Sequence, residues 1–208
     1  NFSGRKTLER TNELADGGNE MNKIITISRE FGSGGRELGR RLSELLNIAY
    51  YDQEIITEIA NQTDLAEQYV EHIIEQQQPI VAFPIHTSRS LCYAAPNPVV
   101  EQRQTVMREQ TRIIREMAEK TDCVIVGRCG DYILRDFRPF RIFVYADLDH
   151  RIQRCMERRT KQEDYSTEVM KKKILSVDKN RSKYYEFYTE QKWGDCLNYD
   201  ICINSSGR

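Results

Sequence analysis

The sequence predicts an α/β protein in which five parallel strands form one sheet with helices on both faces. The first observation is that short, apolar, β-branched runs alternate with segments whose apolar residues recur at helical spacing, as in right-handed βαβ crossovers. The second is that glycine, arginine and aspartate residues follow these runs, where the carboxyl edge of a parallel sheet places ligands. The third is the length of 208 residues, which suffices for one buried core with an inserted lid.

The first half of the chain contains two predicted strands and several helices. Residues 23–28 (KIITIS) form an apolar run that ends at a glycine cluster, and leucines then recur at helical spacing. A short second strand is expected at residues 48–52, and two helical segments follow it from Gln53 onward. Residues 78–99 hold four of the five prolines, which predicts a loop-rich stretch, and a long amphipathic helix comes next.

The second half contains three predicted strands. They cover residues 123–127 (CVIVG), 141–147 (RIFVYAD) and 199–205 (YDICINS). Two helices lie between the last two strands, at residues 149–159 and at about residues 166–189. The first of these helices is rich in arginine, and the second carries aromatic residues near its end.

The composition excludes some classes of function. The net charge of −1 and the pI of about 6.4 give no bulk attraction to a nucleic acid polymer or to an anionic membrane. Six cysteines occur without a C-x-x-C pair, so zinc-site spacing is absent. Cys123 and Cys202 lie in strand-like runs, where a thiol behaves as a small buried hydrophobe. No signal peptide or membrane-length apolar run is found, so we expect a cytoplasmic protein with reduced thiols.

The glycine cluster between the first strand and the first helix predicts a phosphate-binding loop. Gly32, Gly34 and Gly35 allow backbone angles that turn successive N–H groups to one concave side. The helix that follows adds the positive end of its dipole, which also favours phosphate oxygens. The alternative interpretation is a glycine turn that only packs the strand against the helix.

The lysine of the reference loop G-x-x-x-x-G-K-[ST] is missing in both gapless alignments. With Gly34 as the last glycine, Arg29 stands at the first glycine, Gly35 at the lysine and Arg36 at the hydroxyl residue. Shifted by one, Arg36 takes the lysine position, but glutamates then stand at the first glycine and at the hydroxyl residue. We therefore expect Arg36 to supply the missing charge as a planar fork, and Ser33 to offer a hydroxyl to phosphate or magnesium.

Arginines at two further places suit a phosphate. Arg128 leaves the third strand into the crevice and is placed to clamp a phosphate; the alternative is a pair with Asp131 or Asp136. The helix after the fourth strand carries three arginines on one face, and such cations neutralise the charge of a transferring phosphoryl group. These three are Arg151, Arg154 and Arg158.

Two carboxylates and one more arginine have two interpretations each. Asp52 ends the second strand and either contacts the base or ribose of a nucleoside or caps the helix at Gln53. Asp178 and Arg181 are spaced i, i+3, so they either pair with each other, or Arg181 reaches substrate while Asp178 orients it. The aromatic residues between 184 and 193 favour core or dimer packing, with base stacking as the alternative.

Five segments together resemble the cytidylate kinase-like family, a branch of the P-loop nucleoside monophosphate kinases. They are ISREFGSGGRELGRRLSELL, YYDQEII, VIVGRCGDYIL, FVYADLDHRIQRCMERR and DKNRSKYYEFYTEQKWGDCLNYDICINSS. The resemblance covers residues 21–206 and implies a single P-loop NTPase-type domain. It also implies a helical acceptor-binding insert at about residues 53–120 and a lid at about residues 151–180. Residues 1–20 are expected to be a non-native or poorly ordered extension, or else an arm that binds a partner.

The resemblance implies a kinase, that is, a transferase that moves the γ-phosphoryl of ATP, with Mg2+, to CMP or dCMP. The segment from Ser33 to Glu37 matches the part of the loop that holds the donor phosphates, and Arg154 and Arg158 match the start of the lid. The positions that match acceptor-binding residues of the family are Asp52, Arg128, Asp178 and Arg181.

The missing lysine leaves the activity open. Cytidylate kinases carry it, and its loss usually damages phosphoryl transfer, whereas backbone amides still bind phosphate. One alternative is a catalytically weak or inactive nucleotide-binding regulator, and another is a small-molecule kinase with a non-nucleotide acceptor. The expected partners are small-molecule nucleotides, and the aromatic group is compatible with a homodimer.

Overall fold

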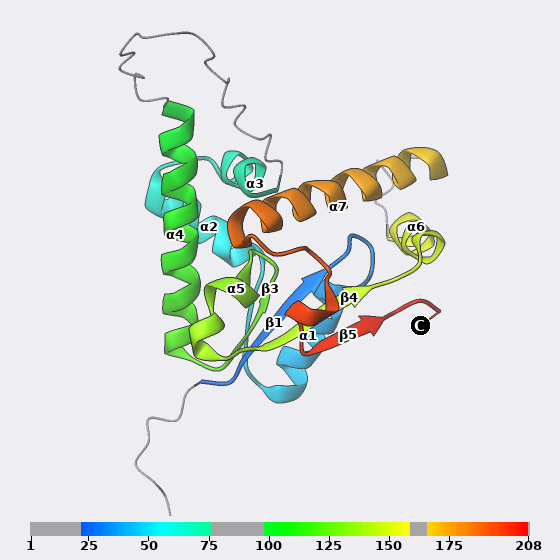
Figure 1. Cartoon of the computed structure of the whole chain (residues 1–208), viewed down its shortest axis with the longest axis horizontal. Coiled ribbons are helices and arrows are strands. Elements are labelled where there is room, and N and C mark those ends of the chain that lie inside the picture. Colours follow the sequence, from blue (N-terminus) through cyan, green and yellow to red (C-terminus); the bar gives the residue numbers. More distant parts are fainter. Residues whose placement is uncertain (1–21, 76–97, 159–165, 208) are drawn as a thin grey trace, which may run out of the picture.

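The computed structural model describes residues 22–75, 98–158 and 166–207. In this part of the chain five strands form one parallel sheet in the order β2-β3-β1-β4-β5, with helices on both faces, so the predicted fold class is confirmed (Figure 1). The strands are β1 (Ile24–Arg29), β2 (Ala49–Tyr51), β3 (Cys123–Val126), β4 (Phe140–Tyr145) and β5 (Ile201–Asn204).

Strand β1 lies at the centre of the sheet, between β3 and β4. Ile27 pairs with Val126 on β3, and Arg29 pairs with Val144 on β4. Because all strands are parallel, the last residue of β1 therefore lies at the carboxyl edge, flanked by the ends of both neighbours. The residues that follow β1 and β3 share one crevice.

The helices follow the predicted order. Near the end of the chain α7 crosses above the sheet and meets α6 (Figure 1). The α-helices are α1 (Gly35–Leu46), α2 (Gln53–Thr63), α3 (Glu67–Glu75), α4 (Pro98–Lys120), α5 (Gly130–Ile133), α6 (Leu148–Glu157) and α7 (Thr167–Thr189), and the 3₁₀ turns are η1 (Arg135–Phe137) and η2 (Cys196–Asn198). The short elements α5, η1 and η2 were not predicted, because three or four residues show no helical period.

Two apolar clusters cover the two faces of the sheet. On one face Leu38 and Leu42 of α1 pack against Ile27 and its neighbours on β3 and β4. On the other face α2, α4 and α7 bury their apolar sides in a larger cluster, which includes Ile125. A third, smaller cluster joins α6 to α7 and includes Phe31, so it connects the last two helices to the glycine loop.

Several expectations lie outside the described residues or need correction. Residues 1–20 and most of the proline-rich stretch at 78–99 are outside the described part of the chain. The interpretation of both strand cysteines as buried is right for Cys123 and wrong for Cys202, which is only partly buried because β5 is an edge strand.

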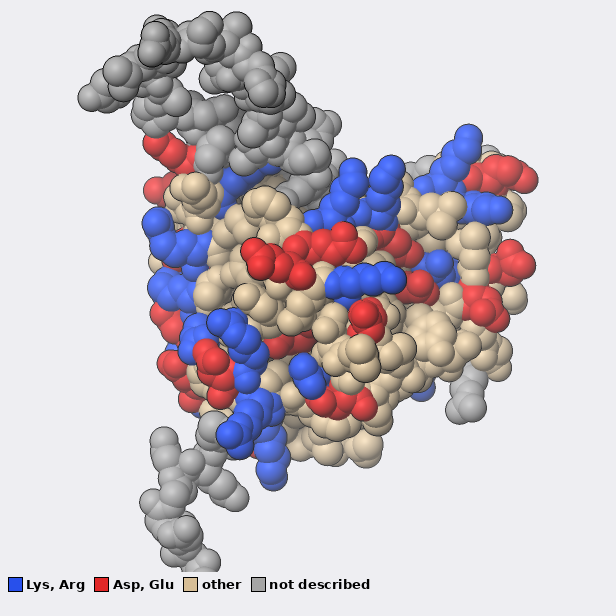
Figure 2. Space-filling model, in the orientation of Figure 1, with Lys and Arg blue, Asp and Glu red and all other residues tan. Residues whose placement is uncertain are grey.

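The described helices include none that is long and apolar enough to cross a membrane. Figure 2 shows acidic and basic side chains interspersed over one face of the molecule.

Candidate active site

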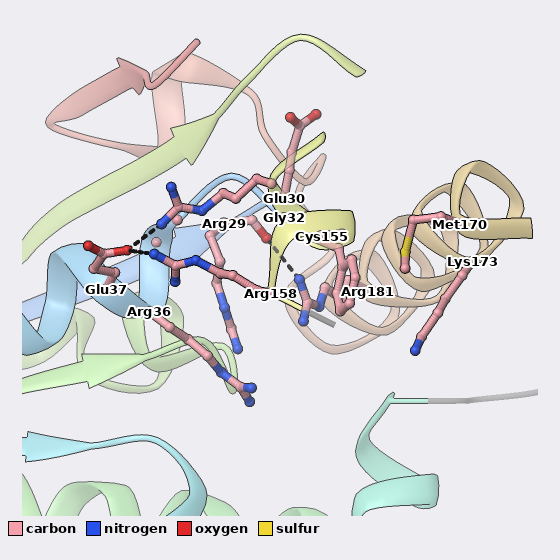
Figure 3. Close-up of a pocket in the computed structure, with 14 residues that line it drawn as sticks. Arg29, Glu30, Gly32, Arg36, Glu37, Cys155, Arg158, Met170, Lys173 and Arg181 are labelled. Carbon is pink, nitrogen blue, oxygen red and sulfur yellow. Dashed lines mark hydrogen bonds and ion pairs between the residues drawn. The ribbon is translucent and has the colours of Figure 1, made fainter. Parts of the chain in front are cut away.

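A cavity of about 280 Å³ lies at the carboxyl edge of the sheet, over the loop that joins β1 to α1. Its walls come from that loop, from α6 and from α7 (Figure 3). The first turn of α1 borders the cavity at Gly35, Arg36 and Glu37, and the free N–H groups of a first turn favour an anion. The loop is thus placed as a phosphate-binding loop requires.

Two glycines of the loop are needed for its close contact with α6. Gly32 and Gly34 have φ values of 81° and 84°, which L side chains rarely adopt. A Cβ at Gly32 would lie 2.9 Å from Sγ of Cys155, and one at Gly34 would lie 3.0 Å from Nη2 of Arg154. The guanidinium of Arg154 therefore already rests on the loop.

Ser33 does not present its hydroxyl to the cavity. The side chain is buried, and its Oγ donates toward the carbonyls of Glu30 at 2.9 Å and Val144 at 3.0 Å. Ser33 thereby fastens the loop to the end of β4. The expectation that this hydroxyl meets phosphate or magnesium finds no support in this geometry.

Arg29, the last residue of β1, lines the candidate site, and the sequence interpretation gave it no role. It is 8% exposed, and it lines the cavity over the loop as well as a second, smaller cavity. Its guanidinium lies 3.7 Å from the Asp52 carboxylate. Burial first, and then the charge of Arg181, lowers the pKa of Arg29 well below its ordinary value; Arg128 and Arg36 act in the same direction, and Asp52 opposes them.

Arg36 and Asp52 form an ion pair at the mouth of the crevice. Nε of Arg36 lies 2.6 Å from Oδ2 of Asp52, and the Arg36 side chain is 54% exposed, whereas Asp52 is buried. Asp52 occupies the N-cap position of α2, as the capping alternative predicts, but its side chain makes no capping hydrogen bond there. Figure 3 shows Arg29 and Arg36 extending from β1 and α1 in the same direction.

The second cavity, of about 40 Å³, adjoins the first at Arg29 and Arg181. Arg128 lines it and is buried, with a left-handed φ of 57°. The two carboxylates that were alternative partners for Arg128 are engaged elsewhere: Asp131 accepts a hydrogen bond from the Tyr185 hydroxyl at 2.6 Å, and Asp136 lies 3.4 Å from Arg115. These contacts engage both carboxylates, and the role of Arg128 as a clamp stays a prediction.

The arginines of α6 divide into two groups. Arg158, just beyond the end of α6, contacts the Glu37 carboxylate (Figure 3), and so does Arg154 in the last turn of the helix. The same carboxylate also pairs with Arg41 at 2.5 Å. The hydrogen bond from Arg158 is the main reason that the pKa of Glu37 lies below its ordinary value. Arg154 and Arg158, which were predicted to start a lid, thus meet a carboxylate at the rim of the loop.

Arg151 has a different neighbourhood. It is buried and pairs with Asp178, which also accepts the N–H of Phe31 at 2.7 Å. Arg181 does not pair with Asp178; its Nη1 donates to the carbonyl of Arg29 at 3.3 Å. Asp178 therefore holds the glycine loop to α7, and its contacts favour a positioning role over the expected contact with an acceptor.

The aromatic residues of α7 and the segment after it pack mainly in the core. Tyr184 and Tyr185 are buried, and Trp193 meets the ring of Phe143 edge-on with centroids 5.5 Å apart. Tyr184 and Trp193 also line the second cavity. Core packing, one of the predicted alternatives, is thus confirmed for these side chains, and the homodimer stays a prediction.

The part of the chain that the structure describes was also examined for a metal site. The described residues include no group of three His, Cys, Asp or Glu side chains that could hold a metal ion. The two carboxylates that line the cavity over the loop, Glu30 and Glu37, each lie within ion-pair distance of an arginine.

The sequence from residue 24 to residue 207 matches the cytidylate kinase-like family. The chain belongs to this family. The predicted resemblance is thereby confirmed, and with it the assignment to kinase-like P-loop proteins. A comparison with curated proteins gave no match.

Solved structures agree with the fold of this cytidylate kinase-like chain. An uncharacterized protein from Eubacterium ventriosum ATCC 27560 is 30% identical, with 89% of each chain covered and a TM-score of 0.63. A shikimate kinase from Bacteroides thetaiotaomicron is 12% identical, with 88% of this chain and 86% of that chain covered and a TM-score of 0.50. The second likeness concerns the fold alone.

Proposed function

We propose that this cytidylate kinase-like protein transfers the γ-phosphoryl group of Mg-ATP to a nucleoside monophosphate, with CMP and dCMP as the preferred acceptors. The observation that carries the proposal is that two adjoining cavities share Arg29 and Arg181. One cavity contains the glycine loop, and the other contains Arg128. A phosphoryl transfer requires a donor and an acceptor site that meet at a cluster of cations.

The donor side is the cavity over the loop. Amides of the first turn of α1 and the guanidinium of Arg154 over Gly34 both favour a phosphate there. Arg158 reaches the same rim from the end of α6. We assign Gly32, Gly34 and Gly35 to the backbone shape of this site, and Arg154 and Arg158 to charge neutralisation on the transferring group.

The acceptor side is the cavity at Arg128. Arg128 and Arg181 provide guanidinium groups that suit an acceptor phosphate, while Tyr184 and Trp193 provide aromatic surface. An acceptor phosphate oxygen would form the new bond to the γ-phosphorus as the bond from that phosphorus to the ADP oxygen breaks. Asp52 stays a candidate for contact with the acceptor nucleoside once Arg36 is drawn to phosphate.

A second candidate function is a nucleotide-binding module with little or no turnover. It is favoured by the Glu37 carboxylate, which occupies both lid arginines, and by the glycine at the lysine position. In this case ATP would bind at the loop, but the lid arginines would not leave Glu37 for the γ-phosphoryl group. A third candidate function is a kinase for a non-nucleotide acceptor, which the acceptor panel distinguishes from the first two.

The test is ADP release from Mg-ATP with and without CMP, dCMP, UMP, AMP and a non-nucleotide acceptor such as shikimate. We expect turnover that depends on CMP or dCMP. Turnover with only the non-nucleotide compound would replace the proposed acceptor. ATP binding without ADP release for any acceptor would leave the binding module. Arg112→Ala on the outer face of α4 is the matched control, because Arg112 pairs only with Glu109 and Glu116 among the described residues.

A further inference from the structure

We propose that Arg29 supplies the positive charge that the missing loop lysine would have supplied, and that positions 29 and 35 have exchanged the glycine and the cation of the reference loop. Arg29 stands where that loop has its first glycine, and Gly35 stands where it has the lysine. The proposal deepens the proposed function, because it names the side chain that holds the ATP phosphates. It differs from the sequence-based expectation, which gave this task to Arg36.

The side chains of positions 29 and 35 compete for the same space. A Cβ at Gly35 would lie 2.5 Å from Cβ and 2.9 Å from Cγ of Arg29. A side chain at position 35 therefore cannot coexist with the stem of Arg29 unless the backbone shifts. The structure accommodates a cation at one of the two positions, and in this chain the cation is at position 29.

A second glycine leaves room for the other end of Arg29. Gly127, directly after β3, has a φ of 74°, and a Cβ there would overlap Nη1 of Arg29. Glycines from two distant segments thus border both the stem and the guanidinium of one buried arginine. A buried side chain with such dedicated space is part of a built site rather than an adventitious surface group.

The charges around Arg29 call for an anion. Its guanidinium has a carboxylate, that of Asp52, at 3.7 Å, and this carboxylate lies closer to Arg36, at 2.6 Å. The positive charges of Arg181, Arg128 and Arg36 act on Arg29 at the same time. Because arginine keeps its proton, a bound phosphate would give the buried Arg29 guanidinium a second anionic neighbour beside Asp52.

Arg36 is a weaker candidate for the same task. Its side chain is 54% exposed and already forms a close pair with Asp52. Arg29 lies deeper, lines both cavities and offers a planar fork that binds two phosphate oxygens at once. Removal of Arg29 should therefore cost more phosphate affinity than removal of Arg36.

The experiment moves the cation from position 29 to position 35 and the glycine from position 35 to position 29. We would compare Arg29→Gly, Gly35→Lys, the double variant Arg29→Gly/Gly35→Lys, and Arg29→Ala/Gly35→Lys as its matched control. The probes are Mg-ATP and inorganic tripolyphosphate, with binding measured by titration calorimetry. The control tests the geometry, because alanine at position 29 keeps the Cβ that would lie 2.5 Å from a Cβ at position 35.

We expect Arg29→Gly to weaken binding of both probes about 10- to 100-fold, as for the loss of a charged hydrogen-bond donor. Arg29→Gly/Gly35→Lys should recover most of that loss, and Arg29→Ala/Gly35→Lys should not. Equal binding by Arg29→Gly and the wild type would overturn the proposal, as would a folded double variant that binds no better than Arg29→Gly.

A second pair of variants covers the case in which the exchanged loops do not fold. Arg29→Lys keeps the charge and Arg29→Met keeps only the length, so binding retained by the first and lost by the second supports the proposal. Equal binding by both overturns it. The binding readout also separates this inference from the proposed function: wild-type binding that depends on Arg29, without ADP release, supports the role of Arg29 and contradicts the kinase.

Discussion

Arginines on helix α4 and arginines at the carboxyl edge of the sheet have opposite surroundings. On α4, Arg112 is solvent-exposed and lies between Glu109 at 2.8 Å and Glu116 at 2.6 Å. At the sheet edge Arg29 is buried, and three guanidinium groups act on it against one carboxylate. Figure 2 shows the mixed acidic and basic surface to which the first arrangement belongs.

Local charge balance and burial, rather than net charge, distinguish the candidate site from the surface of α4. The net charge of −1 conceals a cationic crevice because carboxylates on surface helices balance the total. An exposed pair such as Arg112–Glu116 contributes little to stability or function. A buried guanidinium among other cations is costly unless an anion binds. Variants at both kinds of arginine and at their carboxylate partners test this contrast.

The largest effect is expected at Arg128. Asparagine is the best replacement, because it tolerates the left-handed φ of 57° and removes only the guanidinium. Arg128→Asn should lower acceptor-dependent turnover about 10²- to 10³-fold, the usual cost of one donor aimed at a transferring group. The measurement is kcat/KM for CMP. Unchanged kcat/KM would show that this buried arginine has a structural role and does not contact the acceptor phosphate.

The next effect concerns the stability of the loop. Asp178→Ala removes the partner of buried Arg151 and the acceptor for the Phe31 N–H. Breaking such a buried pair should lower the free energy of unfolding by about 3 kcal/mol. Denaturant unfolding would measure it. Asp178→Asn keeps an acceptor oxygen and should lose less; equal losses would mean that the bond to the loop contributes nothing.

A smaller, pH-dependent effect is expected at Glu37. Its contacts with Arg154, Arg158 and Arg41 hold its pKa below the ordinary 4.5, so they stabilise the folded protein above that pH. The contribution is lost as the pH falls through the lower folded-state pKa. The melting temperatures of wild type and Glu37→Gln should therefore differ at neutral pH and converge in acid. A constant difference would contradict the assignment.

The smallest effect is expected at Arg112. Arg112→Ala removes an exposed side chain that pairs with Glu109 and Glu116 on α4, far from the loop in the sequence, so ATP affinity and acceptor-dependent turnover should match the wild type. Calorimetric titration and the ADP assay would check this. A loss comparable to that of Arg128→Asn would remove the distinction between the two groups of arginines.

The fold was largely predictable from the sequence, and the site only in part. Strand ends were predicted within two residues, because apolar runs and the glycine cluster are local signals. The role of Ser33 was not predictable, since the direction of its hydroxyl depends on the Val144 carbonyl, far along the chain. Arg29 was overlooked for the same kind of reason. The signal was present, because Arg29 stands at the first-glycine position and Gly35 at the lysine position of the reference loop, but the space for the Arg29 guanidinium depends on Gly127.

The close approach of positions 29 and 35 also constrains how such a loop can evolve. One substitution at a time leads either through a chain with two side chains in one space or through a chain with no cation at either position. We therefore expect a change at only one of the two positions to disturb either the packing of the loop or its binding of phosphate, so any redesign of the loop has to treat positions 29 and 35 as one unit.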